Sequence, residues 1–168
     1  MTTEQLIFSS SLATSPVSIP GPWQAEVAKK LLSGENVLSA LEVDLDARLR
    51  FDAGLVVVTN RRIMARAPGE KAWQDWTFRE GLSLQHHDHA GVGHLELVDR
   101  QGRLAAWRFT LGKNLQAIRV LDSFREQLDS HLTGLPLKVA EQNICPSCKA
   151  PLAPDEEECP ICTKVLHT

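Results

Sequence analysis

The sequence of 168 residues contains no tyrosine, and its four cysteines all follow residue 144. Residues 1–144 can therefore form no disulfide of their own. No apolar run approaches the roughly 20 residues that a membrane-spanning helix needs, since residues 55–58 are among the longest such runs. Residues 1–20 lack the basic start and long apolar core of a secretory signal peptide. We therefore expect a cytoplasmic protein.

The sequence also has no excess of positive charge. Its formal net charge is −3 and its pI is about 6.1, so the whole chain offers no field for binding a polyanion. No motif places a nucleophile, a base and a carboxylate together, and Asp44 and Asp46 lie on the polar side of an alternating strand. We predict no catalytic residues and no nucleic-acid partner.

Two matched cysteine pairs close the chain, Cys145-Pro-Ser-Cys148 and Cys159-Pro-Ile-Cys162. A gap of two residues lets both thiolates of a tight turn face one metal ion, and the intervening segment is long enough for a hairpin. Four thiolates form the closed tetrahedral site of structural zinc, with no position left for an activated water. The pattern predicts one zinc ion bound by Cys145, Cys148, Cys159 and Cys162.

Three alternatives to zinc stay open at this point. Disulfides need an oxidising compartment, which nothing in the sequence indicates. Rubredoxin-like iron sites use similar turns with a longer insert and a small aromatic core, whereas residues 149–158 contain no aromatic side chain. A redox-active dithiol is the third. Residues 143–164 are too few to bury a core, so metal binding would supply most of their folding free energy.

Hydrophobic periodicity divides the rest of the chain. We expect a disordered tail over residues 1–21, a β-rich domain over 22–134, a linker over 135–142 and a zinc ribbon over 143–168. A helix is predicted over 23–33, ending before Gly34. Alternating residues predict strands at 41–45, 48–59, 62–67, 72–78, 82–88, 93–99 and 104–111.

Details of these strands can be predicted too. Leu49 and Phe51 alternate with charged residues, so we expect them on the buried face, and Gly54 is a candidate bulge. We expect core packing for the tryptophans, Trp23, Trp73, Trp76 and Trp107.

A long amphipathic helix follows, with Asn114 as its predicted cap. Its apolar stripe is expected at Leu115, Ile118, Leu121, Phe124, Leu128 and Leu132. Gly134 and Pro136 should end it. Seven short antiparallel strands closed by one helix predict a barrel of the pleckstrin-homology-like (PH-like) type, capped at one end by the helix.

Two segments carry a resemblance to a known family. Residues 54–63, Gly-Leu-Val-Val-Val-Thr-Asn-Arg-Arg-Ile, resemble the G-x-L-x-L-T-N-x-R-L signature of bacterial PH-like and GRAM-like domains. Residues 34–38, Gly-Glu-Asn-Val-Leu, resemble the G-E-x-V-L that opens the first strand in that family. The resemblance covers residues 23–133 and implies the same barrel.

The features follow one another as a Pro20-Gly-Pro-Trp23 start, a PH-like barrel, the segment Ala106-Trp-Arg-Phe-Thr-Leu-Gly112, a long helix and the paired Cys-Pro-x-Cys motifs. This order resembles the N-terminal cytoplasmic extension of a group of bacterial ABC exporters, nearest those associated with cyanophycin metabolism. The resemblance implies a non-catalytic regulatory or assembly module at the inner face of the bacterial inner membrane. Its partners would be the membrane and ATPase domains of the exporter. This sequence holds neither membrane helices nor a G-x-x-x-x-G-K-S/T phosphate loop. We therefore expect an N-terminal module without them; the alternative is a stand-alone adaptor that binds a protein or membrane lipid.

Two polar clusters are further candidates. On a strand, His87 and His89 share a face, and across the following turn His94 is expected opposite His89, a set that suits a second metal ion or a pH response near 6. A solvated hairpin tip is the alternative. The other cluster gathers basic side chains on the first strands, but neighbouring aspartates weaken the field that a lipid headgroup would meet. Its members are Arg48, Arg50, Arg61, Arg62 and Arg66.

Overall fold

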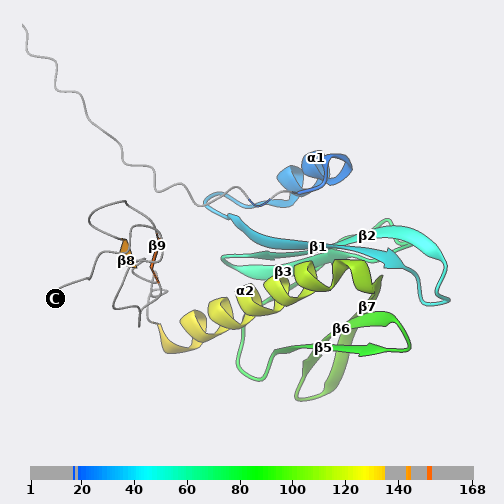
Figure 1. Cartoon of the computed structure of the whole chain (residues 1–168). Coiled ribbons are helices and arrows are strands. Elements are labelled where there is room, and N and C mark those ends of the chain that lie inside the picture. The colour runs from blue at the N-terminus through cyan, green and yellow to red at the C-terminus, as the bar shows by residue number, and fades with distance from the viewer. Residues whose placement is uncertain (1–16, 18, 135–142, 145–150, 153–168) are drawn as a thin grey trace, which may run out of the picture. The chain divides into compact units, whose positions relative to one another are not determined.

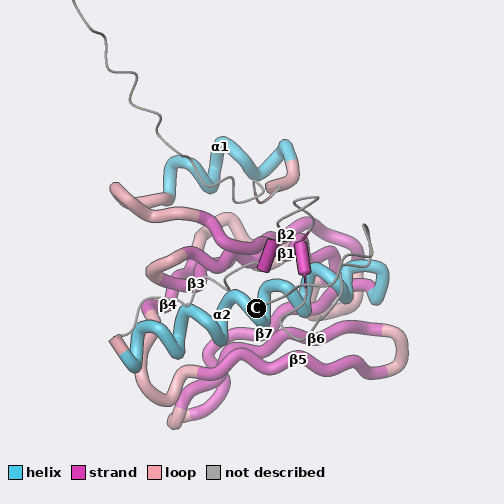
Figure 2. The backbone as a smooth tube through the Cα atoms, turned by 60° about the vertical axis from the view of Figure 1, so that its left-hand side comes forward, coloured by secondary structure: helices cyan, strands magenta, loops and turns pink. Residues whose placement is uncertain are grey.

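One antiparallel sheet of seven strands organises the first of the two units into which the chain divides, Met1–Thr133 and Gly134–Thr168. The computed structural model describes residues 17, 19–134, 143–144 and 151–152. The strands run in the order β4-β3-β2-β1-β7-β6-β5 (Figure 1, with β4 labelled in Figure 2). Their bounds are β1 (Val37–Leu45), β2 (Phe51–Thr59), β3 (Arg62–Arg66), β4 (Gln74–Thr77), β5 (Ser83–His89), β6 (Val92–Asp99) and β7 (Gly102–Thr110). A mainly β unit with a helix after its last strand is confirmed.

The sheet is almost divided between β1 and β7. These strands are paired only at Leu45 and Arg108, whereas β1 pairs with β2 along nearly its whole length. The edges are β4 and β5, and they do not pair with each other in the described residues. The sheet is therefore open, with β1–β4 in one half and β5–β7 in the other.

Helix α2 (Asn114–Thr133) lies against the inner face of both halves, in contact with β1, β2 and β5 (Figure 1). It closes a core to which both halves of the sheet contribute. The largest fully buried members of this core are Phe109, Phe124, Leu41, Ile63, Leu95 and Leu97. Burial of such side chains is the main favourable contribution to folding.

The predicted phase of the α2 stripe is partly wrong. Leu121 and Phe124 are buried, but Leu115 is 72% exposed, and Ile118 and Leu132 are exposed as well. The helix instead buries Ala117 and Val120, whose small side chains allow close approach to the sheet. Leu111 is exposed too and belongs to a 3₁₀ turn, Leu111–Lys113. Because helix and turn are continuous, Asn114 is itself helical and does not cap α2.

The start of the second strand was also predicted wrongly. β2 begins at Phe51, and residues 46–50 form the turn before it. The Asp46 carboxylate accepts hydrogen bonds from the backbone N–H groups of Arg48 and Arg50, which folds the chain back and leaves Leu49 with φ +60°. Phe51 is consequently 80% exposed.

Helix α1 (Gly21–Lys30) covers the opposite face of the β1–β4 half (Figure 2). β2 is buried on both faces, so Leu55 and Val57 point away from the main core and pack against Trp23 and Val27 of α1. This explains why residues 54–59 are continuously buried instead of alternating. α1 confirms the predicted first helix, and of the expected tail before it, Ile19 packs on this second cluster.

Gly54 allows β2 to bend closely over its neighbour. The pairing of β1 with β2 shifts register beside it, between Val43 and Leu45. A Cβ at position 54 would lie 2.6 Å from the Arg66 carbonyl oxygen and from Pro68. The absence of a side chain is therefore required for this approach.

In the second unit the structure describes two short strands, β8 (Asn143–Ile144) and β9 (Pro151–Leu152), which pair antiparallel. The four cysteines of the predicted zinc site lie outside the described residues. Among the helices of the described part, none has the length and apolar character to span a bilayer.

Candidate functional site

The two segments that resemble PH-like signatures meet around one buried carboxylate. The Glu35 side chain is fully buried and accepts hydrogen bonds from Thr59 Oγ1 at 2.7 Å and from Arg62 Nε at 2.9 Å. Backbone N–H of Leu32 donates a further bond at 2.8 Å. Arg62 also donates to the Lys30 carbonyl and pairs with Asp75. These residues join the end of α1 to the β2–β3 turn.

Electrostatics favours the ionised form of Glu35. Burial alone would raise the pKa of Glu35, but the hydrogen bonds from Arg62, Leu32 N–H and Thr59 outweigh it and hold this pKa below its ordinary value. The same pair raises the pKa of Arg62. Asn60 extends the junction, since its side chain accepts from Asn36 N–H and donates to the Gly34 carbonyl. The signature residues thus hold the fold together.

A second polar cluster fixes α1 to the sheet. Arg66 Nη1 donates to both carboxylate oxygens of Glu26, and the Trp73 indole N–H donates to the same group. The Arg66 guanidinium lies 4.7 Å from the Trp23 ring centre, and the Trp23 and Trp73 rings meet edge to face. The hydrogen bonds from Trp73 and Arg66 lower the pKa of Glu26. Core packing is confirmed for Trp23.

The arginines of the first strands are therefore mostly engaged. Arg50 pairs with Asp46, Arg62 with Glu35 and Asp75, and Arg66 with Glu26. The remaining two, Arg48 and Arg61, are exposed. The carboxylates considered for catalysis are engaged in the same way, since Asp44 accepts from the backbone and hydroxyl of Thr110 and Asp46 shapes the β1–β2 turn.

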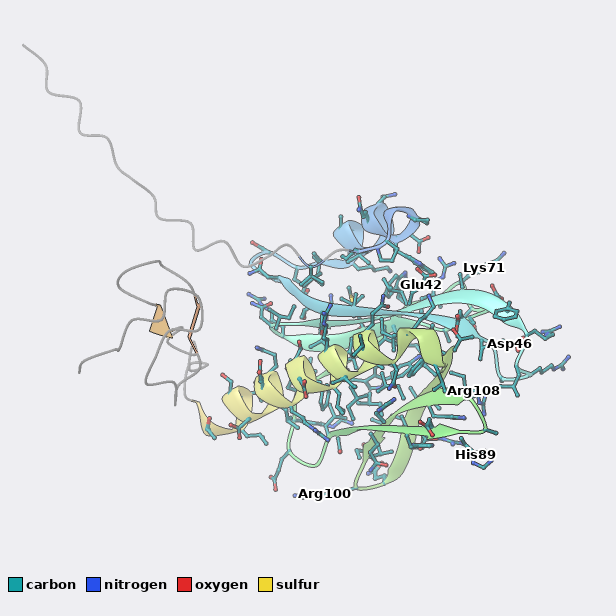
Figure 3. The ribbon with its side chains drawn as sticks, in the orientation of Figure 1. Glu42, Asp46, Lys71, His89, Arg100 and Arg108 are labelled. Carbon is teal, nitrogen blue, oxygen red and sulfur yellow. The ribbon has the colours of Figure 1, made fainter. Side chains whose placement is uncertain are left out.

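The histidine hairpin forms, but with another pairing than predicted. His94 lies directly opposite His87, and their rings are stacked with centres 5.1 Å apart, whereas His89 lies opposite Val92. On its other side His94 is paired with Arg108 of β7. Figure 3 labels Arg108 and His89. Burial lowers the pKa of His94, and the charge of Arg108 adds to this effect.

This arrangement disfavours a metal ion. Parallel stacked imidazoles do not direct their nitrogens at one point, and Arg108 brings a positive charge next to them. Within the described ranges no three side chains of His, Cys, Asp or Glu converge as metal ligands. The fourth histidine of the segment, His86, faces inward and stacks on Phe109.

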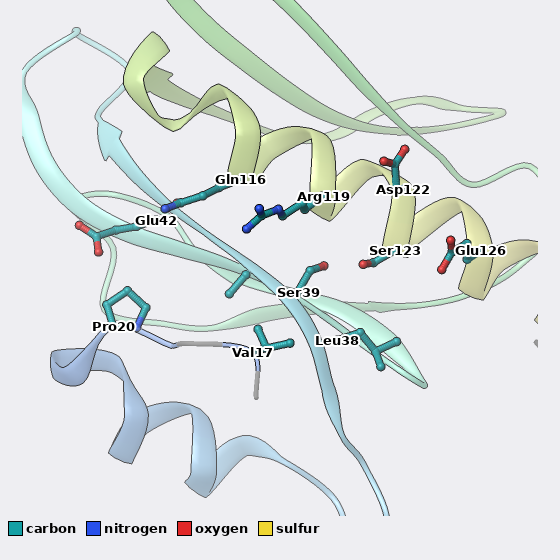
Figure 4. A pocket seen from close by; sticks show the side chains of 11 residues that line it. Val17, Pro20, Leu38, Ser39, Glu42, Gln116, Arg119, Asp122, Ser123 and Glu126 are labelled. Atoms are coloured by element: carbon teal, nitrogen blue, oxygen red, sulfur yellow. The ribbon is translucent and has the colours of Figure 1, made fainter. Parts of the chain in front are cut away.

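A groove of about 540 Å³ lies along β1, between α2 and the chain that precedes α1 (Figure 4). Its apolar side is formed by half-buried side chains, Val17, Pro20, Leu38 and Ala40. From α2, Arg119 and Ser123 point toward β1, and the Ser39 hydroxyl points toward α2. The rim carries the carboxylates of Glu42, Asp122 and Glu126.

Ser39 is the distinctive residue of this groove. It is 6% exposed, and its Oγ has no hydrogen-bond partner among the described residues. A buried hydroxyl without a partner is destabilising, which makes it a place where a ligand can supply the missing bond. No sequence pattern predicted the groove, although one signal was present: Ser39 is a polar residue in the inward register of Leu41 and Val43.

Comparison of the chain with protein-family models, with curated proteins and with solved structures gives no match.

Proposed function

We propose that this chain is a non-catalytic interaction module built from a PH-like domain and a zinc ribbon. The observation that carries the proposal is the pair of Cys-Pro-x-Cys motifs following a sheet of order β4-β3-β2-β1-β7-β6-β5 with a helix after its last strand. Two halves of a sheet with one helix against the shared core are the arrangement that we expect of a PH-like barrel.

The donor set fits zinc. Four cysteines in two pairs supply four thiolates, which is a complete tetrahedral ligand set. The pairing of β8 with β9 supports this proposal, because it brings Asn143 opposite Leu152 and so brackets the segment that contains Cys145 and Cys148. Bound zinc would stabilise the fold of the second unit and supply no chemistry on a substrate.

The proposed biological setting follows from the resemblance. The module would be the N-terminal cytoplasmic part of a bacterial ABC exporter, held at the inner face of the membrane, with the membrane and ATPase domains as its partners. Asp44 and Asp46, the carboxylates considered for catalysis, are engaged in hydrogen bonds within the fold, which supports a binding role over a catalytic one. Pairing of most arginines of the first strands favours a protein partner over lipid.

The experiment is zinc analysis of the whole chain with Cys148→Ser as the variant. We expect one zinc per wild-type chain and none in the variant. Because all four tryptophans belong to the first unit, the near-ultraviolet circular dichroism of tryptophan should be the same in both proteins. A variant that keeps its zinc would contradict the ligand assignment. A variant whose tryptophan signal is lost would contradict the division into a PH-like domain and a separate ribbon.

A further inference from the structure

We infer that the groove between β1 and α2 binds an extended segment of a protein partner that carries a basic side chain. This inference rests on the proposed interaction function and names its site. The segment would add as a strand along the free edge of β1, with its side chains meeting α2 on one side and the Val17 and Pro20 side of the groove on the other.

The backbone of β1 has a free edge beside the groove. Its pairing with β7 is limited to Leu45 and Arg108, so over residues 38–42 the edge that faces away from β2 has no partner strand in the described residues. Backbone N–H and C=O groups at such an edge are templates for another strand. Leu38, Ala40 and Glu42 of this stretch line the groove.

The part of α2 that lines the groove has the length of a short strand. The lining residues of α2 run from Gln116 to Glu126. At a rise of about 1.5 Å per residue this is about 15 Å of helix. An extended chain covers that length in four or five residues at about 3.3 Å each. The groove is therefore about as long as a strand of four or five residues.

The hydroxyl of Ser39, which has no hydrogen-bond partner among the described residues, also favours an added strand. It is buried and directed toward α2 across the groove. A strand added to β1 brings backbone N–H and C=O groups into reach of such a hydroxyl, which can both donate and accept. The added bond would remove the cost of burying this group alone.

The charges that line the groove favour a basic side chain. Glu42 is paired with Lys113 at 3.5 Å, which leaves Asp122, Glu126 and Arg119 as the charged lining residues without an ion pair among the described residues. Arg119 lies three residues before Asp122 and offsets one of the two carboxylates, so the lining keeps one negative charge in excess. A basic side chain of the bound segment would balance this excess, whereas an acidic one would add to it.

The test uses the full chain labelled with ¹⁵N and three heptapeptide probes of alternating sequence. The first has the sequence Lys-Val-Thr-Val-Lys-Val-Thr, the second has both lysines replaced by glutamate, and the third has both threonines replaced by proline. Main-chain hydrogen bonds carry much of the affinity in strand addition, so an arbitrary basic strand-forming peptide is a fair probe. We expect the lysine peptide to shift the amide signals of residues 38–42 and 116–126.

The expected ranking of the probes follows from the same arguments. The glutamate peptide should bind more weakly, and the proline peptide should not bind, because proline cannot donate to a ladder. No shifts with the lysine peptide at about 1 mM, or equal shifts with the proline peptide, would overturn the inference.

Matched variants of the protein locate the site. Ser39→Ala should weaken binding of the lysine peptide roughly five- to tenfold, as expected for one lost hydrogen bond, without lowering stability, because the free hydroxyl has no partner. Glu126→Lys should weaken binding of the lysine peptide, whereas Asp129→Lys, on the same helix outside the groove, should not. Equal effects of Glu126→Lys and Asp129→Lys would contradict the placement.

Amide hydrogen exchange of the free chain distinguishes the other occupants. We expect the edge amides of residues 38–42 to exchange rapidly until peptide is added. Protection that disappears when residues 1–16 are deleted would assign the groove to this chain's own N-terminal segment and overturn the inference. Protection that rises with protein concentration would assign it to a second copy, with the same consequence. Failure of peptide binding in a chain that retains zinc would leave the proposed function standing.

Discussion

Removal of Arg62 is the most informative perturbation of the fold, and Arg62→Met is the substitution of choice because methionine keeps the aliphatic part of the side chain. The variant would leave the carboxylate of Glu35 fully buried, with only the Thr59 hydroxyl and the Leu32 N–H as hydrogen-bond donors. Breaking a buried pair from one side costs about 3–5 kcal/mol. Since the Arg62 side chain is 13% exposed, we expect the lower end of this range.

Urea unfolding followed by tryptophan fluorescence measures the effect. With a slope of about 1–3 kcal/mol per molar urea, a loss of about 3 kcal/mol lowers the midpoint by about 1–3 M. Arg103→Met is the matched control, because its pair with Glu96 is exposed and should contribute little. The double variant Glu35→Gln/Arg62→Met should recover part of the loss, since no unpaired buried charge remains.

The pH dependence of the free energy of unfolding gives an independent check, because the wild type and the Arg62→Met variant should respond differently to acid. In the wild type the pKa of Glu35 is lowered below that of the unfolded chain, so its contribution to stability is present above about 4.5 and is lost as the pH falls further. Without Arg62, only the hydrogen bonds from Leu32 and Thr59 oppose the effect of burial, so the pKa of Glu35 should rise relative to the wild type and the variant should lose less stability in acid. A loss below about 1 kcal/mol, with an unchanged pH profile, would refute the assignment of this pair as a buried one.

Three further outcomes are expected. A Cβ at Gly93 would lie 2.2 Å from the Phe109 ring, so Gly93→Ala should lower the free energy of unfolding by about 1–3 kcal/mol. Gly112→Ala, with open space around it, should not. Equal urea midpoints of these two variants would contradict the packing of Phe109 against Gly93. The pKa of His94 is lowered in the folded state, so protonation of the unfolded chain lowers stability as the pH falls below about 6.5. His94→Gln should therefore reduce this loss of stability between pH 7 and pH 5. A series of thermal melts in which His94→Gln and the control His131→Gln behave alike would contradict this role of His94. Trp23→Ala should detach α1 from the sheet and lower the free energy of unfolding by about 3–5 kcal/mol, since Trp23 is 5% exposed. A urea midpoint equal to that of the wild type would contradict the role of the apolar cluster between α1 and β2.

Periodicity predicted most of the strands because alternation follows directly from the pleat. The strand predicted over 93–99 is β6 (Val92–Asp99), and Trp107 and Phe109 of β7 are buried as expected. Where the prediction failed, the missing information was tertiary. Leu49 and Phe51 alternate correctly, but the Asp46 turn begins before them and places them beyond the core.

The same difference between local pattern and tertiary packing explains why the groove and its surroundings were not predicted. A helix of suitable period can present several neighbouring apolar stripes, and the sheet selected the one that contains Ala117 and Val120 instead of Leu115. The groove depends on the divergence of β1 from β7, which no local pattern encodes. Glu35 and Arg62 were visible only as parts of a signature, because their pairing joins residues 27 positions apart.

We propose that the chain joins a folded β-domain to a segment that binds zinc, and native mass spectrometry of the whole chain before and after a strong chelator is the first experiment to make. We predict one zinc ion per chain, lost with the chelator. The near-ultraviolet circular dichroism of the four tryptophans, all of which belong to the first unit, should be unchanged by this treatment. A chain without metal, with its cysteines free or linked as disulfides, would contradict the account. Loss of the tryptophan signal together with the metal would also contradict it, because the β-domain would then depend on zinc.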